Sequence, residues 1–446
     1  MTELSAPPAA PERTNGRPPT LPAASAAAQP VEAGGSPVPR PPNGNGHAPA
    51  PRANGPGRPT ANGGKLPYAH IVGWGMAVPE RVMTNDDLAR LVDTSDEWIV
   101  ARTGIRQRRI AGPKETTASL AAEAARRALE VADVPAEVVD LVIVATSTPE
   151  HAFPSTASLV QDAVGAENAG AFDLAAACTG FIYGLAMGSA AIRSGAAQTV
   201  LVIGAETLSR VVNWKDRGTC ILFGDGAGAF LLQGRESPGG LLSSLLRSDG
   251  SGGDSLIIPA GGSKLPATYD TVHDNLHTIH MDGKEVYRFA TRVMTSAVRE
   301  VVEAAGLTLE QIRLIVPHQA NRRIIESAAK TLGLAEDRFM LNLDRYGNTS
   351  AASIPIAVCE AVAQGRLRPD DHLVLVGFGA GLTWGAAVLK WEATPIEVTA
   401  WSRVRRQAAY QLARVRSAAR RGLRSLEGVL FGSQSPEGGQ APPRRK

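Results

Sequence analysis

The sequence is poor in cysteine and aromatic residues and has no long hydrophobic run. Cysteine occurs only three times in 446 residues, at positions 178, 220 and 359, which is too few for a disulfide framework and suits a reducing compartment. No apolar run reaches the ~18 residues of a membrane-spanning helix, and no charged start followed by a Leu-rich stretch opens the chain. We therefore predict a cytoplasmic protein without a membrane span or secretory signal.

The overall charge and the histidine spacing bear on nucleic-acid and metal binding. The chain has 46 Lys and Arg against 43 Asp and Glu, a formal net charge of +3, so its overall charge predicts no nucleic-acid partner. The spacing of His273, His277 and His280 resembles that of metal ligands, but no cysteine lies near them. We predict no metal ion.

The chain divides into four segments. Residues 1–64 are dominated by Pro, Ala, Gly and Asn, which predicts a disordered tail. Short apolar runs then alternate with Ala-rich helical stretches, which predicts an α/β architecture with halves at residues 65–240 and 241–392. Residues 393–446 show apolar side chains every three or four positions with arginines between them, the pattern of a basic amphipathic helix. This helix would bind an anionic membrane surface or an acidic partner, or fold back on the globular part.

The two predicted halves repeat the same order of elements. In the first half a strand is expected to end near Thr146, and Cys178 opens a helix of small residues. In the second half a strand is expected to end at His318, and Asn348 opens the next helix. Duplicated halves would place Cys178, His318 and Asn348 around a common centre. Coincidence among alternating elements is the competing interpretation.

Cys178 is the candidate nucleophile. It lies in Asp173-Leu-Ala-Ala-Ala-Cys-Thr-Gly-Phe, at the predicted first turn of a helix over residues 179–193. Amide N–H groups and the helix dipole would stabilise a thiolate there and lower the pKa of the thiol. The alternative is a packed core cysteine, which is how we interpret Cys220 and Cys359.

His318 and Asn348 are the candidate partners of this cysteine. His318 follows a predicted strand, where a side chain can point into a cleft, although a lone histidine is often only a satisfied polar group. Asn348 precedes a predicted helix, where asparagine is by default an N-cap. A Cys/His/Asn set fits covalent acyl transfer, but it also fits a cysteine protease or amidase.

Six motifs, one of them in two parts, follow one another along the globular part of the chain: Asp96-Glu-Trp-Ile-Val-Ala-Arg-Thr-Gly-Ile, Ala176-Ala-Cys-Thr-Gly-Phe, Asp216-Arg-Gly-Thr with Phe223-Gly-Asp-Gly-Ala-Gly, Pro317-His-Gln-Ala-Asn, Gly347-Asn-Thr-Ser-Ala-Ala-Ser, and Gly377-Phe-Gly-Ala-Gly-Leu-Thr-Trp-Gly. In content and order they resemble the thiolase superfamily, and more closely the 3-oxoacyl-[acyl-carrier-protein] synthase III family. The resemblance covers about residues 68–391. It implies a thiolase-like fold, in which two duplicated βαβαβαββ halves form a five-layer αβαβα sandwich.

The resemblance implies a decarboxylative Claisen condensation. Cys178 would take the acyl group of an acyl-CoA primer, and His318 and Asn348 would stabilise the enolate formed as malonyl-acyl carrier protein loses CO2. The amides of Cys178 and Ala380 would form the oxyanion hole. No metal or redox cofactor is implied, because the loss of CO2 supplies the carbanion. The 3-oxoacyl-carrier protein product would start fatty-acid or related polyketide biosynthesis.

The family also implies a site for coenzyme A. Trp98 and Arg217 match the positions that hold the adenine between them, and Thr94 and Arg102 lie near it in the family. A stacked ring together with a cation suits a nucleotide that carries phosphates. The alternative for Trp98 is a role in filling the core.

Carrier-protein and subunit contacts follow from the same resemblance. Arg288, Arg323 and Lys330 match the basic surface that receives the acidic carrier protein, although such charges are often only solvated. Phe153 matches the residue that reaches across a homodimer to line the acyl tunnel. We therefore expect a homodimer.

Other functions on the same fold remain open. An acyltransferase of specialised metabolism would pass the acyl group to a hydroxyl or an amine, and the intact Asn348 argues against it. A non-catalytic partner subunit would normally have lost the nucleophile, whereas Cys178 is present.

Overall fold

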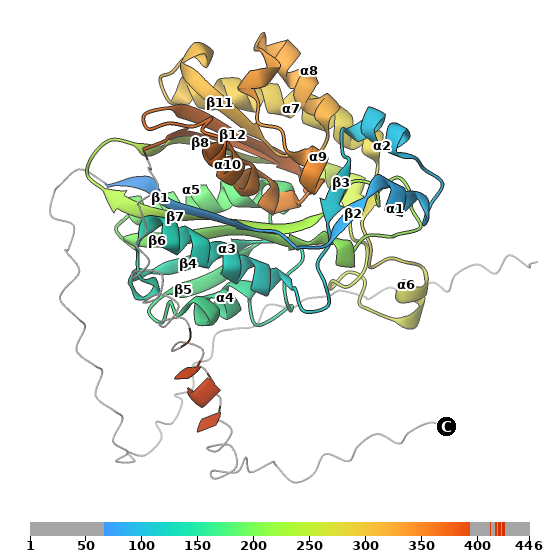
Figure 1. Cartoon of the computed structure of the whole chain (residues 1–446), viewed down its shortest axis with the longest axis horizontal. Coiled ribbons are helices and arrows are strands. Elements are labelled where there is room, and N and C mark those ends of the chain that lie inside the picture. The colour runs from blue at the N-terminus through green and yellow to red at the C-terminus, as the bar shows by residue number, and fades with distance from the viewer. Residues whose placement is uncertain (1–66, 393–410, 412–414, 417, 421, 424–446) are drawn as a thin grey trace, which may run out of the picture. The chain divides into compact units, whose positions relative to one another are not determined.

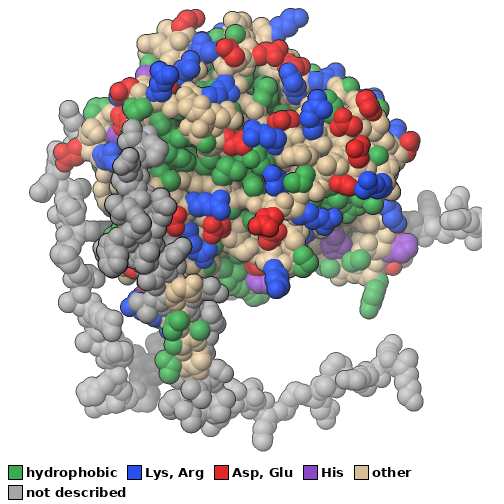
Figure 2. All heavy atoms as spheres, in the orientation of Figure 1, with side chains coloured by type: hydrophobic (Ala, Val, Ile, Leu, Met, Phe, Trp, Pro, Cys, Tyr) green, Lys and Arg blue, Asp and Glu red, His purple; other side chains and the backbone are tan. Residues whose placement is uncertain are grey.

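The computed structural model describes residues 67–392, together with residues 411, 415–416, 418–420 and 422–423 (Figure 1). The predicted tail at residues 1–64 lies outside the described residues, and so does most of the predicted basic helix, although its few described residues are helical. Within the described ranges, no helix is both long enough and apolar enough to cross a membrane. Basic and acidic side chains alternate over the face shown in Figure 2, which agrees with the small net charge.

The first sheet has five strands, most of them buried on both faces. Their spatial order is β1-β7-β6-β4-β5, in which β4 runs parallel to β5 and β6, and β7 runs antiparallel to β1 and β6. Runs of Val and Ile fit central strands that are covered on two sides. The strands are β1 (Tyr68–Ala77), β4 (Leu141–Ala145), β5 (Gly170–Leu174), β6 (Thr199–Thr207) and β7 (Asp225–Arg235).

The second sheet has four strands in the order β11-β12-β13-β8. Strand β11 is parallel to β12, whereas β13 is antiparallel to both β12 and β8. The strands are β8 (Gly240–Ser248), β11 (Ile312–Pro317), β12 (His372–Gly379) and β13 (Thr383–Lys390).

Helices separate and cover the two sheets, so the chain forms five layers (Figure 1). Helices α3 (Thr117–Ala132) and α4 (Thr156–Val164) cover the outer face of the first sheet, and α7 (Gly283–Ala304) and α8 (Arg322–Leu332) cover the outer face of the second. Helices α5 (Gly180–Arg193) and α10 (Ser353–Ala363) lie between the sheets and are almost wholly apolar or small, because both of their sides are packed. The predicted thiolase-like αβαβα sandwich is confirmed.

The short helices α2, α6 and α9 project at one side of the sandwich in Figure 1. Loops at this side surround the candidate site. The short elements of the whole fold are β2 (Val82–Thr84), α1 (Asn85–Ala89), α2 (Asp96–Thr103), β3 (Gln107–Arg109), η1 (Ala136–Val138), η2 (Ala177–Thr179), η3 (Leu208–Arg210), η4 (Gly250–Ser255), β9 (Leu256–Ile257), α6 (Tyr269–His273), β10 (His280–Met281), η5 (Leu309–Gln311), η6 (Glu336–Arg338), α9 (Leu343–Tyr346) and η7 (Ser350–Ala352).

The two halves meet through direct backbone contact. A Cβ atom placed on Gly204 of β6 would lie 2.2 Å from the carbonyl oxygen of Ala351 in η7. A Cβ atom placed on Gly379 at the end of β12 would lie 2.8 Å from the amide nitrogen of Cys178 in η2. Only glycine permits these approaches without moving a backbone. The turns before α5 and α10 are therefore held against the ends of the strands.

Replacing Gly204 should loosen this contact. The Gly204→Ala variant is expected to lose about 1–3 kcal/mol of unfolding free energy, because its methyl group would displace the η7 backbone. Urea unfolding followed by circular dichroism measures the loss. The matched control is Gly250→Ala, since an added Cβ there meets no atom within 4 Å. Equal stability of the two variants would contradict the proposed close packing.

Candidate active site

Cys178 lies in the η2 turn that links β5 to α5. Its side chain is buried, and the preceding Ala177 has a left-handed backbone with φ of 45°. The turn is tied to the second sheet: the hydroxyls of Thr179 and Thr383 both donate to the carbonyl oxygen of Ala176, at 2.6 and 3.2 Å. Helix α5 starts at Gly180, one residue after the predicted start. The sulfur is thus held by a turn that contacts both halves.

Burial raises the pKa of the Cys178 thiol to about 12. Loss of water around the charged form is the main cause, the Glu206 carboxylate raises the pKa further, and a hydrogen bond with the Ser350 side chain opposes both. The prediction that the helix N-terminus lowers this pKa is therefore wrong in direction. In the resting site the sulfur keeps its proton.

His318 follows β11 and is almost completely buried. Its Nδ1 atom lies 2.7 Å from the Ser353 hydroxyl, and its ring meets Phe378 edge-on with centroids 5.4 Å apart. Burial lowers the pKa of the imidazole to about 3, so the ring is neutral at physiological pH. When the Ser353 hydroxyl donates to Nδ1, the ring proton resides on Nε2, which is then a hydrogen-bond donor.

Asn348 is fixed through its backbone and one side-chain atom. Its amide donates to the Leu222 carbonyl at 2.8 Å, and its carbonyl accepts from the Gly224 amide at 3.0 Å. Its Oδ1 accepts from the Ser350 amide at 2.8 Å, so the side chain caps the η7 turn, whereas the N-cap of α10 is Ala352. In the described part of the chain, Nδ2 donates to no other group, which leaves it for a ligand.

Cys178, His318 and Asn348 line one small cavity. Its volume is about 90 Å³, and we call it the thiol cavity. The other lining residues come from β9, β10, α7 and β12 and from the segments before β7 and around the start of α8: Leu222, Phe223, Leu256, Met281, Gly283, Val286, Tyr287, Ala320, Asn321, Ile324, Phe378 and Gly379.

A second, mostly apolar cavity begins at the same sulfur. Its volume is about 330 Å³, and we call it the acyl cavity because a hydrocarbon chain would fit its lining. Ala380, the predicted second oxyanion-hole residue, lines it beside Cys178 and Ser350. The remaining lining residues are Ser147, Thr148, Ala177, Leu208, Val211, Phe223, Leu256, Ile257, Ile258 and Ile279.

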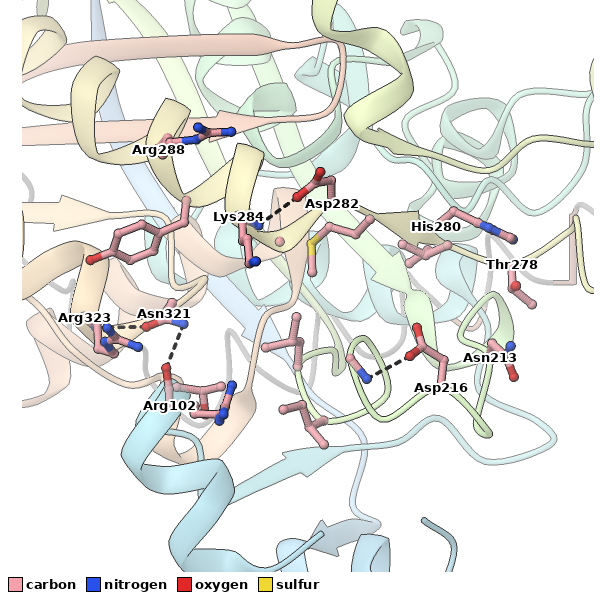
Figure 3. Close-up of a pocket in the computed structure, with 18 of the residues that line it drawn as sticks. Arg102, Asn213, Asp216, Thr278, His280, Asp282, Lys284, Arg288, Asn321 and Arg323 are labelled. Carbon is pink, nitrogen blue, oxygen red and sulfur yellow. Dashed lines mark hydrogen bonds between the residues drawn. The ribbon is translucent and has the colours of Figure 1, made fainter. Parts of the chain in front are cut away.

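A much larger depression of about 1420 Å³, the mouth cavity, lies next to the thiol cavity (Figure 3). The two share Leu222, Met281, Gly283, Tyr287 and Asn321 in their linings. The remaining lining residues of the mouth cavity are Trp98, Arg102, Thr103, Asn213, Asp216, Gly218, Ile221, Asp254, Thr278, Ile279, His280, Asp282, Lys284, Arg288 and Arg323.

Trp98 lines the mouth cavity, and two arginines lie against its ring. The guanidinium carbon of Arg102 is 4.3 Å from the ring centroid, and that of Arg217 is 5.2 Å away. Arg217 also donates to the carbonyl and the carboxylate of Asp93, at 3.0 and 3.2 Å. The hydroxyl of Thr94 is buried without a partner in the described structure. The structure thus brings Trp98, Arg102 and Arg217 together.

The space between Trp98 and Arg217 is too narrow for a stacked base. A planar ring needs about 7 Å between its two neighbours, twice an ordinary van der Waals contact. The measured 5.2 Å means that Arg217 must swing away from Trp98 before a base can enter.

The predicted carrier-protein residues do not all lie at the cavity. Arg288 of α7 and Arg323 of α8 line the mouth cavity, where Arg323 lies 5.7 Å above the ring of Tyr287. Lys330 is exposed two turns further along α8 and lines none of the three cavities. Phe153 is 86% exposed and does not line the acyl cavity of its own chain.

Sequence reasoning missed four polar residues around these cavities. Lys284 lines the mouth cavity, and Ser353 orients His318. Glu206 and Ser350 are buried, and both shift the pKa of Cys178. Ser350 and Ser353 stand in the recognised Asn348 motif, so only Lys284 and Glu206 lacked a sequence signal that linked them to the thiol.

Comparison with known proteins supports one family. The model described as 3-oxoacyl-[acyl-carrier-protein] synthase III matches residues 172–250, and the model of the C-terminal part of that enzyme matches residues 302–391. The beta-ketoacyl-[acyl-carrier-protein] synthase III of Symbiobacterium thermophilum is 57% identical over 73% of this chain and 99% of its own. The corresponding protein of Caldanaerobacter subterraneus is 55% identical over 72% and 98%.

Solved structures agree with the sequence relatives. The synthase III of Thermus thermophilus has a TM-score of 0.68 and 49% identity, covering 73% of this chain and 100% of its own. The priming beta-ketosynthase of the R1128 polyketide pathway has a TM-score of 0.69 and 36% identity, with coverages of 75% and 98%.

Together with the cysteine, histidine and asparagine around one cavity, these similarities establish that this chain belongs to the 3-oxoacyl-[acyl-carrier-protein] synthase III family of acyl-transferring condensing enzymes.

Proposed function

We propose that this enzyme condenses an acyl-CoA primer with malonyl-acyl carrier protein, releasing CO2 and 3-oxoacyl-carrier protein. The observation that carries the proposal is the position of Cys178, which lines both the acyl cavity and the thiol cavity. An acyl group on the sulfur can occupy the apolar side, while a second thioester meets His318 and Asn348 on the polar side. One sulfur therefore serves two substrates in turn.

The first half-reaction transfers the primer to Cys178. The sulfur attacks the thioester carbon of the acyl-CoA, and coenzyme A leaves as its thiolate. The amides of Cys178 and Ala380 would hold the oxyanion of the tetrahedral intermediate. Gly379 keeps this side of the turn open, because any Cβ atom there would press on the Cys178 amide.

The second half-reaction makes the new carbon–carbon bond. Nε2–H of His318 and Nδ2–H of Asn348 donate to the thioester oxygen of the malonyl group and stabilise the enolate as CO2 leaves. The carbanion attacks the acyl-enzyme, and the Cys178 thiolate is expelled. No metal or redox group is needed for this chemistry, because decarboxylation supplies the carbanion.

Residues in and around the mouth cavity would bind coenzyme A and the acyl carrier protein. Trp98, Arg102 and Arg217 would hold the adenine nucleotide of coenzyme A once Arg217 has moved, with Thr94 beside them. Arg288, Arg323 and Lys330 would receive the acidic carrier protein.

Subunit and cellular contacts belong to the same proposal. Phe153 would reach the acyl cavity of a second copy in a homodimer, which its exposure supports. The enzyme would work in the cytoplasm, and its basic C-terminal segment would contact an anionic membrane surface or an acidic partner.

The separate roles of the three residues can be tested by intact-mass measurement after incubation with acyl-CoAs. Cys178→Ala should take up no acyl group. His318→Ala and Asn348→Ala should still be acylated but decarboxylate malonyl-carrier protein about 100–1,000-fold more slowly, since each loses a donor to the enolate oxygen. Loss of acylation with intact decarboxylation would show that the roles are misassigned.

The raised pKa of Cys178 predicts a distinctive alkylation profile. A thiolate is the reactive form, so the rate of modification of Cys178 by iodoacetamide should rise about tenfold per pH unit from pH 7 to pH 10, without a plateau. Peptide mapping by mass spectrometry would assign the site, with Cys178→Ala as control. A plateau below pH 9 would mean that the helix N-terminus lowers the pKa of the Cys178 thiol by more than burial raises it.

Reversing the charge of Lys330 should weaken carrier-protein binding. Lys330→Glu is expected to raise the KM for malonyl-carrier protein about 2–10-fold at low salt, with a smaller effect at high salt. Arg313→Glu, an exposed cation on β11 outside the three cavities, serves as the matched control. Equal KM values for the two variants would remove Lys330 from the docking surface.

A further inference from the structure

Glu206 is a buried carboxylate that the mechanism above does not use. It lies near the end of β6 and is completely buried. Its oxygens accept from the Thr148 hydroxyl at 2.6 Å, from the Ser147 amide at 3.1 Å and from the Thr146 hydroxyl at 3.3 Å. Within residues 67–392, it forms no ion pair with a Lys, Arg or His. Burying a carboxylate without a cation is costly, so such a group requires an explanation.

Ser350 lies between this carboxylate and the nucleophile. It lines the acyl cavity with Cys178, and its neighbour Ala351 contacts Gly204 of β6, two residues before Glu206. Its side chain lowers the pKa of both the Cys178 thiol and the Glu206 carboxyl. Ser350 is itself buried and has a left-handed backbone with φ of 46°, a strained conformation for a residue other than glycine. Asn348 Oδ1 holds the Ser350 amide at 2.8 Å and so fixes the turn.

This network approaches the sulfur from the acyl side. Ser147, Thr148 and Ser350 line the acyl cavity with Cys178. His318 and Asn348 line the thiol cavity instead. Cys178 therefore borders two sets of polar residues, one in each cavity, and the Ser350 amide joins them through Asn348 Oδ1.

We propose that Glu206 is a positioning residue that, through the Ser350 hydroxyl, holds the thiol proton of Cys178 for the lifetime of the acyl-enzyme. The inference rests on the proposed function and adds to it the acceptor of the thiol proton.

Every proton that is transferred in one catalytic cycle has a donor and an acceptor. As sulfur bonds to the primer carbon, the thiol proton passes to Ser350 Oγ, and the proton of Ser350 passes to Glu206. Coenzyme A leaves as a thiolate and takes one proton from solvent. After decarboxylation and carbon–carbon bond formation, the expelled Cys178 thiolate recovers its proton from Glu206 through Ser350. One solvent proton is consumed for each CO2 released, as the overall condensation requires.

The electrostatics of the network agree with this role. Burial raises the pKa of Glu206 to about 7, against the opposing hydrogen bonds of Thr148, Ser147, Ser350 and Thr146. A carboxylate with a pKa near the working pH is well placed to accept and return a proton. When Glu206 is protonated, the buried site loses its negative charge while the acyl group occupies the cavity.

Few other titratable groups adjoin the network. Cys178 is coupled to Glu206 directly, and His318 stays neutral because burial lowers its pKa to about 3. Asp225, next to the strand partner of Glu206 on β7, directs its carboxylate to the Ala111 and Ser209 amides, at 2.7 and 2.9 Å. Burial also raises the pKa of Asp225, so Glu206→Gln is needed to assign a pH dependence near neutrality to Glu206.

The test compares two reactions of the same sulfur in Glu206→Gln. Single-turnover acylation by acyl-CoA at pH 8 should be about 100-fold slower, because the proton acceptor is lost. Alkylation by iodoacetamide at the same pH should be faster, because removal of the anion lowers the pKa of the thiol. The rise of the acylation rate through about pH 7 should also disappear. Unchanged acylation, or a fall in both reactions, would overturn the proposal.

A second variant tests the relay itself. Ser350→Gly removes the hydroxyl while tolerating the left-handed backbone, and it should slow acylation as Glu206→Gln does. The double variant should be no slower than the slower single one, because both remove the same pathway. If the fold-reductions in acylation rate of the two single variants multiplied in the double variant, the proposed relay would be wrong.

Two controls distinguish the role of Glu206 from the proposed condensing activity. Glu360→Gln alters another buried carboxylate, bound by Arg345 at 2.7 Å, and should acylate at the normal rate. Malonyl decarboxylation should be equal in Cys178→Ala with and without Glu206→Gln. Uptake of an acyl group by Cys178→Ala at this site would defeat the proposed function itself, whereas normal acylation of Glu206→Gln would defeat only the role of Glu206.

Discussion

The active site depends on two backbone turns that are packed directly against the ends of strands from both halves. Gly204 admits the Ala351 carbonyl, and Gly379 admits the Cys178 amide, at distances that no side chain would allow. Each turn contains a left-handed residue, Ala177 in one and Ser350 in the other, directly before a buried helix. These matching conformations support the duplication of the halves. Each half contributes one turn, and the reacting groups lie where the turns meet.

The same close packing controls the electrostatics. Because water is excluded, burial holds the Cys178 thiol and the His318 ring in their neutral forms and raises the pKa of Glu206 towards neutrality. The condensation develops one negative charge at a time. In a low-dielectric site, each hydrogen bond that is donated to the charged atom is stronger than it would be in water. In the resting site, therefore, both the thiol of Cys178 and the ring of His318 are uncharged.

Much of the architecture could be predicted from local patterns. Apolar runs of strand length and small-residue helices identified the α/β class, and the predicted start of the helix after Cys178 was wrong by only one residue. The resemblance of the motifs identified the layered fold and brought Cys178, His318 and Asn348 to one candidate site. The direction of the thiol pKa was predicted wrongly, because a helix terminus is visible in a sequence whereas the depth of burial is not.

The sequence by itself determined the order of the elements, the fold class and the residue types available for chemistry, because periodicity and turn residues act over short distances. Only the tertiary structure decided that Ser350 lies beside Cys178 and near Glu206, that Arg217 lies against the Trp98 ring, and that Cys178 lines two cavities. These relations join segments far apart in the chain. They are set by packing and desolvation, which depend on the whole fold and leave no local pattern.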